Sequence, residues 1–131
     1  MALPNGAGGY QLGDGNLTEV ILGTQAAPTA KTAAATLTAA ELATGIITYT
    51  GAAVNLTVPL GADLDVAFSS MKVNSSFDFV IINTDASDAA TVTANTGCTL
   101  VGVAAVNAVT SAMWRVRKTA DATYVFYRIA G

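Results

Sequence analysis

The stretch Phe77-Asp78-Phe79-Val80-Ile81-Ile82-Asn83 gives the strongest strand signal in the chain. Its residues are mostly β-branched or aromatic, the types that favour strands. Apolar side chains would lie on both faces, which is typical of a central strand covered on both sides. Asp78 breaks this pattern, and an unpaired carboxylate in such a strand is costly. The stretch therefore predicts a β-sheet protein in which Asp78 needs a partner.

Shorter strand signals lie on both sides of this stretch. Residues 112–118 and 123–129 flank Ala120-Asp121-Ala122 and predict a C-terminal hairpin. Upstream, residues 46–50 and 54–58 predict a second hairpin. Further short strands are expected at residues 91–94, 99–102 and 104–106.

Helical signals are few. Residues 61–71 place apolar side chains at helical spacing on one face, which predicts one short helix. Thr38 is followed three residues later by Glu41, a capping-box pattern that predicts a single helical turn over residues 39–43.

About seven to nine short strands and one short helix predict a mainly β fold, an antiparallel β-sandwich or an open barrel. Residues 36–131 are expected to form the β-sandwich domain, and residues 1–35 an extended N-terminal arm and linker. The glycines of residues 1–16 are typical of loops, but Leu3, Tyr10 and Leu12 are spaced through them. This segment is either a disordered terminus or an arm that becomes ordered on a partner.

The composition indicates a surface that partners cover. Hydrophobic residues make up 52% of the 131 residues and charged residues only 11%, less than half the ~25% of an ordinary soluble domain. A chain with so little charge is expected to bury part of its surface against other proteins. The net charge of −3 disfavours nucleic-acid binding, which needs a basic patch.

The sequence gives no sign of a membrane span or of a secretory signal. No stretch reaches the ~18 consecutive apolar residues of a membrane helix, and the first residues lack a basic segment followed by an apolar core. We therefore expect no membrane partner and synthesis in a cytoplasm.

The chemistry of the side chains argues against an enzyme. The chain has no histidine, which removes the commonest base and metal ligand. Cys98 has no basic neighbour in sequence and is expected to be a small buried thiol. Asp63 and Asp65 would point apart on a helix. We therefore expect no catalytic residue, no cofactor and no metal site.

Asp78 carries the one site hypothesis that follows from the residues themselves. Arg115 and Arg117 alternate with apolar residues on another strand of similar length. We hypothesise that Asp78 forms an ion pair with one of them, across the sheet or across a subunit boundary. The alternative is that Asp78 points to water at an edge.

Several motifs of residues 36–131 resemble a group of small virion structural proteins of tailed phages. They begin with Thr36-Leu37-Thr38-Ala39-Ala40-Glu41-Leu42 and Gly45-Ile46-Ile47, and continue with Phe77-Asp78-Phe79, Ile82-Asn83-Thr84, Gly97-Cys98-Thr99-Leu100-Val101-Gly102, Trp114-Arg115-Val116-Arg117 and Val125-Phe126-Tyr127-Arg128. The start, Ala2-Leu3-Pro4-Asn5-Gly6-Ala7-Gly8-Gly9-Tyr10, is similar to small structural proteins of marine and cyanobacterial phages.

The resemblance best implies a capsid decoration (cement) protein, a homotrimer on the capsid surface of the virion whose partner is the major capsid protein. On this hypothesis the arm contacts the capsid through Leu3, Pro4, Tyr10 and Leu12, and the sandwich forms the rigid body. The sequence leaves open whether the arm contacts the capsid or a neighbouring copy. The alternative function is a receptor- or glycan-binding module of a head fibre or tail fibre.

Overall fold

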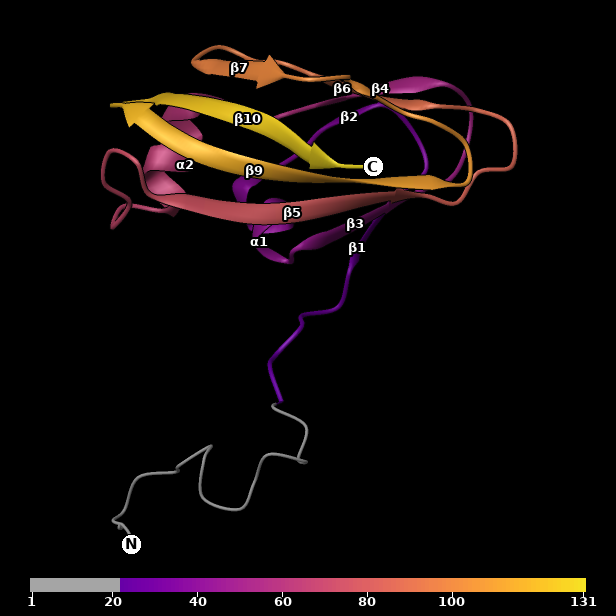
Figure 1. Cartoon of the computed structure of the whole chain (residues 1–131), viewed down its shortest axis with the longest axis horizontal. Coiled ribbons are helices and arrows are strands. Elements are labelled where there is room, and N and C mark those ends of the chain that lie inside the picture. Colours follow the sequence, from indigo (N-terminus) through magenta and orange to yellow (C-terminus); the bar gives the residue numbers. More distant parts are fainter. Residues whose placement is uncertain (1–21) are drawn as a thin grey trace, which may run out of the picture.

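The computed structural model describes residues 22–131 as ten strands and two short helices (Figure 1). The mainly β prediction is confirmed. In chain order the elements are β1 (Thr29–Lys31), β2 (Ala35–Thr36), α1 (Ala39–Ala43), β3 (Ile46–Tyr49), β4 (Val54–Thr57), α2 (Gly61–Ala67), β5 (Ser76–Asn83), β6 (Ala90–Thr93), β7 (Cys98–Val101), β8 (Ala105–Val106), β9 (Thr110–Ala120) and β10 (Thr123–Ala130).

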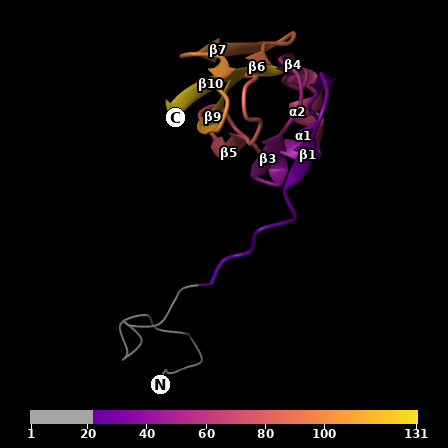
Figure 2. The ribbon, with the colours of Figure 1, turned by 90° about the vertical axis from the view of Figure 1, so that its right-hand side faces the viewer.

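The strands form two sheets that share one core. The six-stranded sheet has the order β1-β3-β5-β9-β10-β7, and the four-stranded sheet has the order β2-β4-β6-β8. The six-stranded sheet curves around the four-stranded one, as the view along the strands shows (Figure 2). The predicted linker before residue 36 therefore supplies an edge strand to each sheet, β1 and β2.

The chain alternates between the two sheets from β1 to β9. From β1 to β6, the next strand of the same sheet runs in the same direction, whereas β8 pairs with β6 in an antiparallel register. Five of the eight pairings in the described chain are parallel, where antiparallel pairing was expected. The chain therefore makes three successive coils, each with one strand in each sheet: β1 and β2, β3 and β4, and β5 and β6. These coils stack on one another as in a parallel β-helix.

The predicted hairpin over residues 46–58 is wrong for the same reason, since β3 and β4 lie in different sheets. The corner between them is at Gly51, whose φ of 141° is open to glycine. A Cβ at this position would lie 2.6 Å from the Thr32 carbonyl oxygen, because the corner before β2 packs directly against it. In place of the expected hairpin turn, the connection from β3 to β4 packs against the connection from β1 to β2.

The predicted C-terminal hairpin is confirmed, since β9 and β10 pair in an antiparallel register from Thr123–Ala120 onward. The strand predicted at residues 77–83 is β5, which lies between β3 and β9. Only one of its faces is fully buried, through Phe79, Ile81 and Asn83. Its other face is half-buried or exposed, because no second layer covers the six-stranded sheet among the described residues.

Both helices close one end of the core. The predicted turn at residues 39–43 is α1, and its capping box is formed as expected between Thr38 and Glu41. The helix predicted at residues 61–71 ends at Ala67, because Phe68 takes a non-helical conformation. Leu64 of α2 is fully buried, so this helix is held by the core rather than by its own length.

The core contains buried side chains from both sheets and both helices. The largest fully buried side chains are Trp114, Tyr49, Tyr124, Phe79 and Phe126. Burying one such large apolar side chain stabilises a fold by ~1.5–3 kcal/mol. At one corner, the buried Asn83 donates hydrogen bonds to the carbonyls of Asp88 (2.8 Å) and Val106 (2.9 Å), which ties β5 to the four-stranded sheet.

Candidate interaction surfaces

The outer face of the six-stranded sheet is a regular surface of the described chain, and its charged side chains on β5 and β9 are Asp78, Arg115 and Arg117. The register places outward-facing side chains in rows across the strands. One row runs through Ile46, Val80 and Met113, and the next through Asp78, Arg115 and Tyr127. We call these two rows the outer sheet face.

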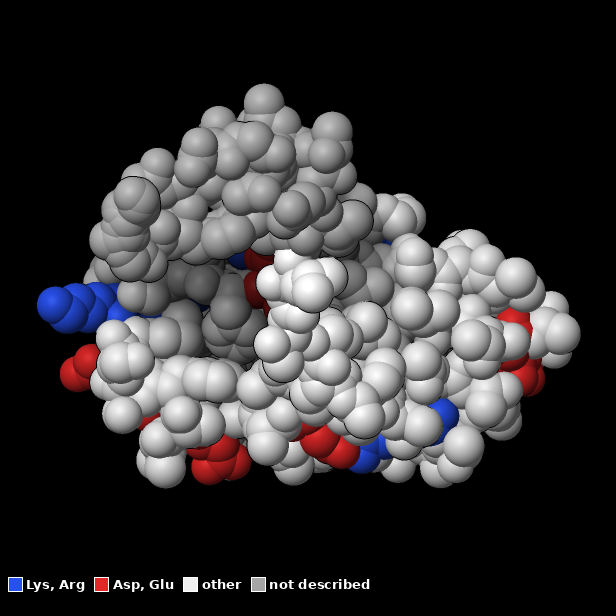
Figure 3. Space-filling view, turned by 90° about the horizontal axis from the view of Figure 1, so that it is seen from below, with Lys and Arg blue, Asp and Glu red and all other residues white. Residues whose placement is uncertain are grey.

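Within the described chain, nothing covers the exposed side chains of the outer sheet face, so a partner could contact them. Met113 is 36% exposed, and Val101, which pairs with Tyr127 at the sheet edge, is 48% exposed. Seen from the side of β5 and β3, charged groups appear only as scattered spots on the described residues (Figure 3). A contiguous face of this kind is typical of a surface that contacts another protein.

Asp78 and Arg115 form the ion pair that the sequence suggested, within the sheet. Arg115 Nε donates to Asp78 Oδ1 at 2.8 Å and Nη2 donates to Oδ2 at 3.0 Å, a bidentate geometry. The hydrogen bond from Arg115 lowers the pKa of Asp78, and the carboxylate raises the pKa of Arg115. The pair is half exposed, with side-chain exposures of 48% for Arg115 and 39% for Asp78.

Arg117, the other candidate partner of Asp78, makes different contacts. Its Nε donates to the Tyr127 hydroxyl at 2.9 Å and its Nη1 donates to Asn74 Oδ1 at 2.8 Å. The guanidinium also lies 5.6 Å from the centre of the Tyr127 ring, within the range of a cation–π contact. Arg117 therefore holds the loop before β5 and orients Tyr127 on the outer sheet face.

A second surface lies at the end of β10, where a groove of about 460 Å³ opens between β10 and the connection from β7 to β8. We call it the C-terminal groove. Its walls include Val103, 66% exposed, and Ile129, 49% exposed. Arg128 Nη1 donates to the carbonyls of Val103 (2.9 Å) and Ala105 (2.5 Å). Within residues 22–131 no carboxylate forms an ion pair with Arg128.

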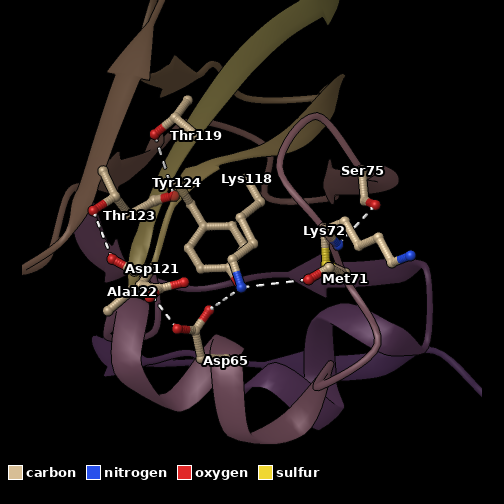
Figure 4. A network of polar contacts seen from close by, with 10 residues as sticks. All are labelled: Asp65, Met71, Lys72, Ser75, Lys118, Thr119, Asp121, Ala122, Thr123 and Tyr124. Atoms are coloured by element: carbon tan, nitrogen blue, oxygen red, sulfur yellow. Dashed lines mark hydrogen bonds and ion pairs between the residues drawn. The ribbon is translucent and has the colours of Figure 1, made fainter.

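A polar cluster that the sequence did not reveal joins α2 to the β9–β10 hairpin (Figure 4). Asp65 Oδ1 accepts a hydrogen bond from the Tyr124 hydroxyl (2.6 Å) and lies 3.0 Å from Lys118 Nζ. Asp65 Oδ2 accepts from the backbone N–H of Ala122 at 2.7 Å. Lys118 is only 8% exposed. Spacing along the chain gave no signal for this cluster, because Asp65 and Tyr124 are 59 residues apart.

The hydrogen bonds and charges of this cluster keep Asp65 and Tyr124 in the protonation states that favour their contacts. Hydrogen bonds from Tyr124 and then Lys118 lower the pKa of Asp65. Burial, followed by the hydrogen bond to Asp65, raises the pKa of Tyr124. Asp65 therefore stays ionised and Tyr124 stays protonated at neutral pH, so the three side chains hold helix and hairpin together.

Two glycines, Gly61 and Gly97, lie close to the β9–β10 hairpin where it meets α2. A Cβ at Gly61 or Gly97 would lie 2.0 or 2.2 Å from the carbonyl oxygen of Ala122. Gly97 also has a φ of 84°, which favours glycine. The start of α2, the turn before β7 and the tip of the β9–β10 hairpin can meet only because both positions lack a side chain.

Cys98 is the small buried thiol that the sequence predicted. Its Sγ donates to the Pro59 carbonyl at 3.3 Å, and burial raises the pKa of the thiol to about 11. A thiol with this pKa is protonated at neutral pH and is a poor nucleophile.

The part of the chain that the structure describes holds neither a metal-ligand cluster nor a helix long enough for a membrane. Residues 22–131 contain no group of three or more Cys, Asp or Glu side chains placed to hold a metal ion. In the same residues, no helix has the length and apolar character needed to cross a bilayer. The predicted arm contacts, Leu3, Pro4, Tyr10 and Leu12, lie outside the described residues.

Comparison of the chain with protein-family models, with curated proteins and with solved structures finds no match in any of the three.

Proposed function

We propose that the protein is a non-enzymatic structural protein of a phage virion, which binds the outer surface of the capsid and stabilises contacts between major capsid proteins. The observation that carries the proposal is the outer sheet face. It presents Val80 and Met113 beside the Asp78–Arg115 ion pair, on a chain with only 11% charged residues. The motifs that resemble tailed-phage virion proteins suggest the major capsid protein as the partner.

The outer sheet face suits a lattice contact in three respects. Its strands are long, with 8 residues in β5 and 11 in β9, so the face is rigid. Its apolar row gains free energy when a partner removes it from water, about 25 cal/mol per Å². Its bidentate pair offers a charged feature that a partner surface must match, which gives orientation more than affinity.

Copies of the protein are expected to act together as a homo-oligomer, with a trimer favoured. Several weak contacts on one oligomer add up to tight binding through effective concentration. Binding at positions where capsid proteins meet would then resist their separation.

The test is binding of the purified protein to capsids that lack it, measured by co-sedimentation. The variant Met113→Glu places a charge in the apolar row of the outer sheet face, and Val66→Glu is the matched control on α2, where Val66 is 82% exposed. We expect Met113→Glu to remain folded and to lose capsid binding, while Val66→Glu binds like the unchanged protein. Equal binding by both variants, or binding to host cells or polysaccharide but not to capsids, would overturn the proposal.

A further inference from the structure

The C-terminal groove contains a cation without a carboxylate partner. Arg128 uses Nη1 to hold two backbone carbonyls of the groove wall. A guanidinium has five N–H donors, so others are free to bind an acceptor. Apart from Asn107, the remaining lining residues are apolar or glycine, and Val103 and Ile129 are exposed. The groove therefore fits a segment that combines apolar side chains with negative charge.

The first 21 residues of the chain have this composition. They contain two acids, Asp14 and Glu19, and neither lysine nor arginine. They also contain apolar side chains at intervals, among them Tyr10 and Leu12. The groove volume of about 460 Å³ lies within the ~300–1,000 Å³ of pockets that take small ligands, enough for apolar side chains of this size.

A neighbouring copy lies within reach of this segment, which joins the body at β1. Residues 22–28 are all exposed, and they lead away from the body at β1 (Figures 1 and 2). β1 is one edge of the six-stranded sheet, and β7, beside the groove, is the other edge. Twenty-one extended residues span up to ~70 Å, whereas a 100-residue domain has a radius of gyration of only ~13 Å.

We infer that residues 1–21 of one copy dock in the C-terminal groove of a second copy, with Tyr10 and Leu12 against Val103 and Ile129 and an acidic side chain on Arg128. The inference deepens the proposed function and rests on it only in requiring several copies side by side. Because the segment joins the body at β1 and the groove lies beside β7, the contact would join two different surfaces and be head-to-tail. Contacts of this type close into rings when the rotation allows, which is how a trimer would arise.

The experiment uses mixtures of full-length variants in solution, without capsids. One chain carries Gln11→Cys between the two apolar residues of the segment, and a second, ¹⁵N-labelled chain carries Val103→Cys in the groove. The mixture is oxidised, and mass spectrometry separates mixed pairs from pairs of one variant. Cys98 is buried and its pKa is raised, so it stays out of the reaction.

We expect the Gln11→Cys chain to form mixed disulfides with the Val103→Cys chain about tenfold faster than with a Val66→Cys chain, which is the matched control. Docking raises the effective concentration of the first pair of thiols. Changing Asp14→Lys and Glu19→Lys on the donor chain should reduce this preference, and so should salt, which screens the contact with Arg128.

Equal rates at Val103→Cys and Val66→Cys would overturn the inference. So would a preference that the two lysine substitutions leave unchanged. Since no capsid is present, neither result bears on capsid binding, which the Met113→Glu variant tests separately.

Discussion

Asp78 and Arg115 face each other across β5 and β9, and two hydrogen bonds of 2.8 and 3.0 Å join them on an otherwise apolar stretch of the outer sheet face. The pair is half exposed, and exposed ion pairs contribute little to stability. Under the proposed function the pair has a different role, since a partner that covers the outer sheet face would also cover the pair.

The variant Asp78→Ala separates these two roles. We expect Tm to fall by no more than about 4 °C, because the pair is exposed. Capsid binding should weaken at least tenfold, because a partner would then bury Arg115 without its counter-charge. Thermal unfolding and co-sedimentation measure the two effects. Asp63→Ala, an exposed acid on α2, is the control and should change neither.

Stability should fall with acid through carboxylates whose pKa the fold lowers, among them Asp65 and Asp85. The pKa of Asp65 is lowered from its ordinary value of 3.8, and backbone hydrogen bonds from Asp88 and Ser87 lower that of Asp85. A carboxyl whose pKa is lower in the folded state stabilises the protein above the unfolded pKa, and this stabilisation is lost as the pH falls.

We therefore expect the urea midpoint to be flat between pH 5 and 7 and to fall as the pH drops below about 4. Asp65→Asn should lower the midpoint at pH 7 and reduce the fall in acid. A midpoint in Asp65→Asn that keeps the full acid dependence would contradict the assignment to this group.

Gly97→Ala tests the packing of the junction under α2. The new Cβ would lie 2.2 Å from the Ala122 carbonyl oxygen, at a φ of 84°. We expect a loss of about 1–3 kcal/mol in the free energy of unfolding, measured with urea. Gly23→Ala is the matched control, since nothing lies within 4 Å of its Cβ position, and it should be nearly neutral.

Leu64→Ala tests whether α2 is held by the core. Leu64 is fully buried, so its truncation should cost ~2–5 kcal/mol, the range for a cavity in a packed core. Val66→Ala, two residues along the same helix, should change stability by less than about 0.5 kcal/mol, because Val66 is 82% exposed. Similar losses in the two variants would contradict the docking of α2.

Cys98 should react with thiol reagents only when the protein unfolds. Burial keeps the thiol covered and raises its pKa to about 11, so thiolate is scarce at pH 8. We expect slow labelling of the native protein and rapid labelling in urea, followed by mass. Rapid labelling of the native protein would show that the turn at Gly97 opens readily.

The sequence predicted the elements of this fold better than their connections. β5, the β9–β10 hairpin and the capping box of α1 follow from local patterns, which residue type and spacing encode. The parallel pairing of β3 with β5 does not, because a strand signal carries no direction and the corner at Gly51 resembles an ordinary turn.

The candidate surfaces were predictable to different degrees. Asp78 was detectable because a carboxylate interrupts an apolar strand, and its partner Arg115 because arginine alternates with apolar residues on β9. The C-terminal groove and the Asp65 cluster were not detectable, since each joins segments that only the fold brings together. The choice between Arg115 and Arg117 required the register of β5 against β9.

A reconstruction of the virion by electron cryomicroscopy tests the central claim most directly. We predict density for the protein on the outside of the capsid, with β5, β9 and β10 turned toward a neighbouring protein and Met113 buried in the contact. Particles in which the outer sheet face is turned to solvent, or from which the protein is absent, would contradict the account.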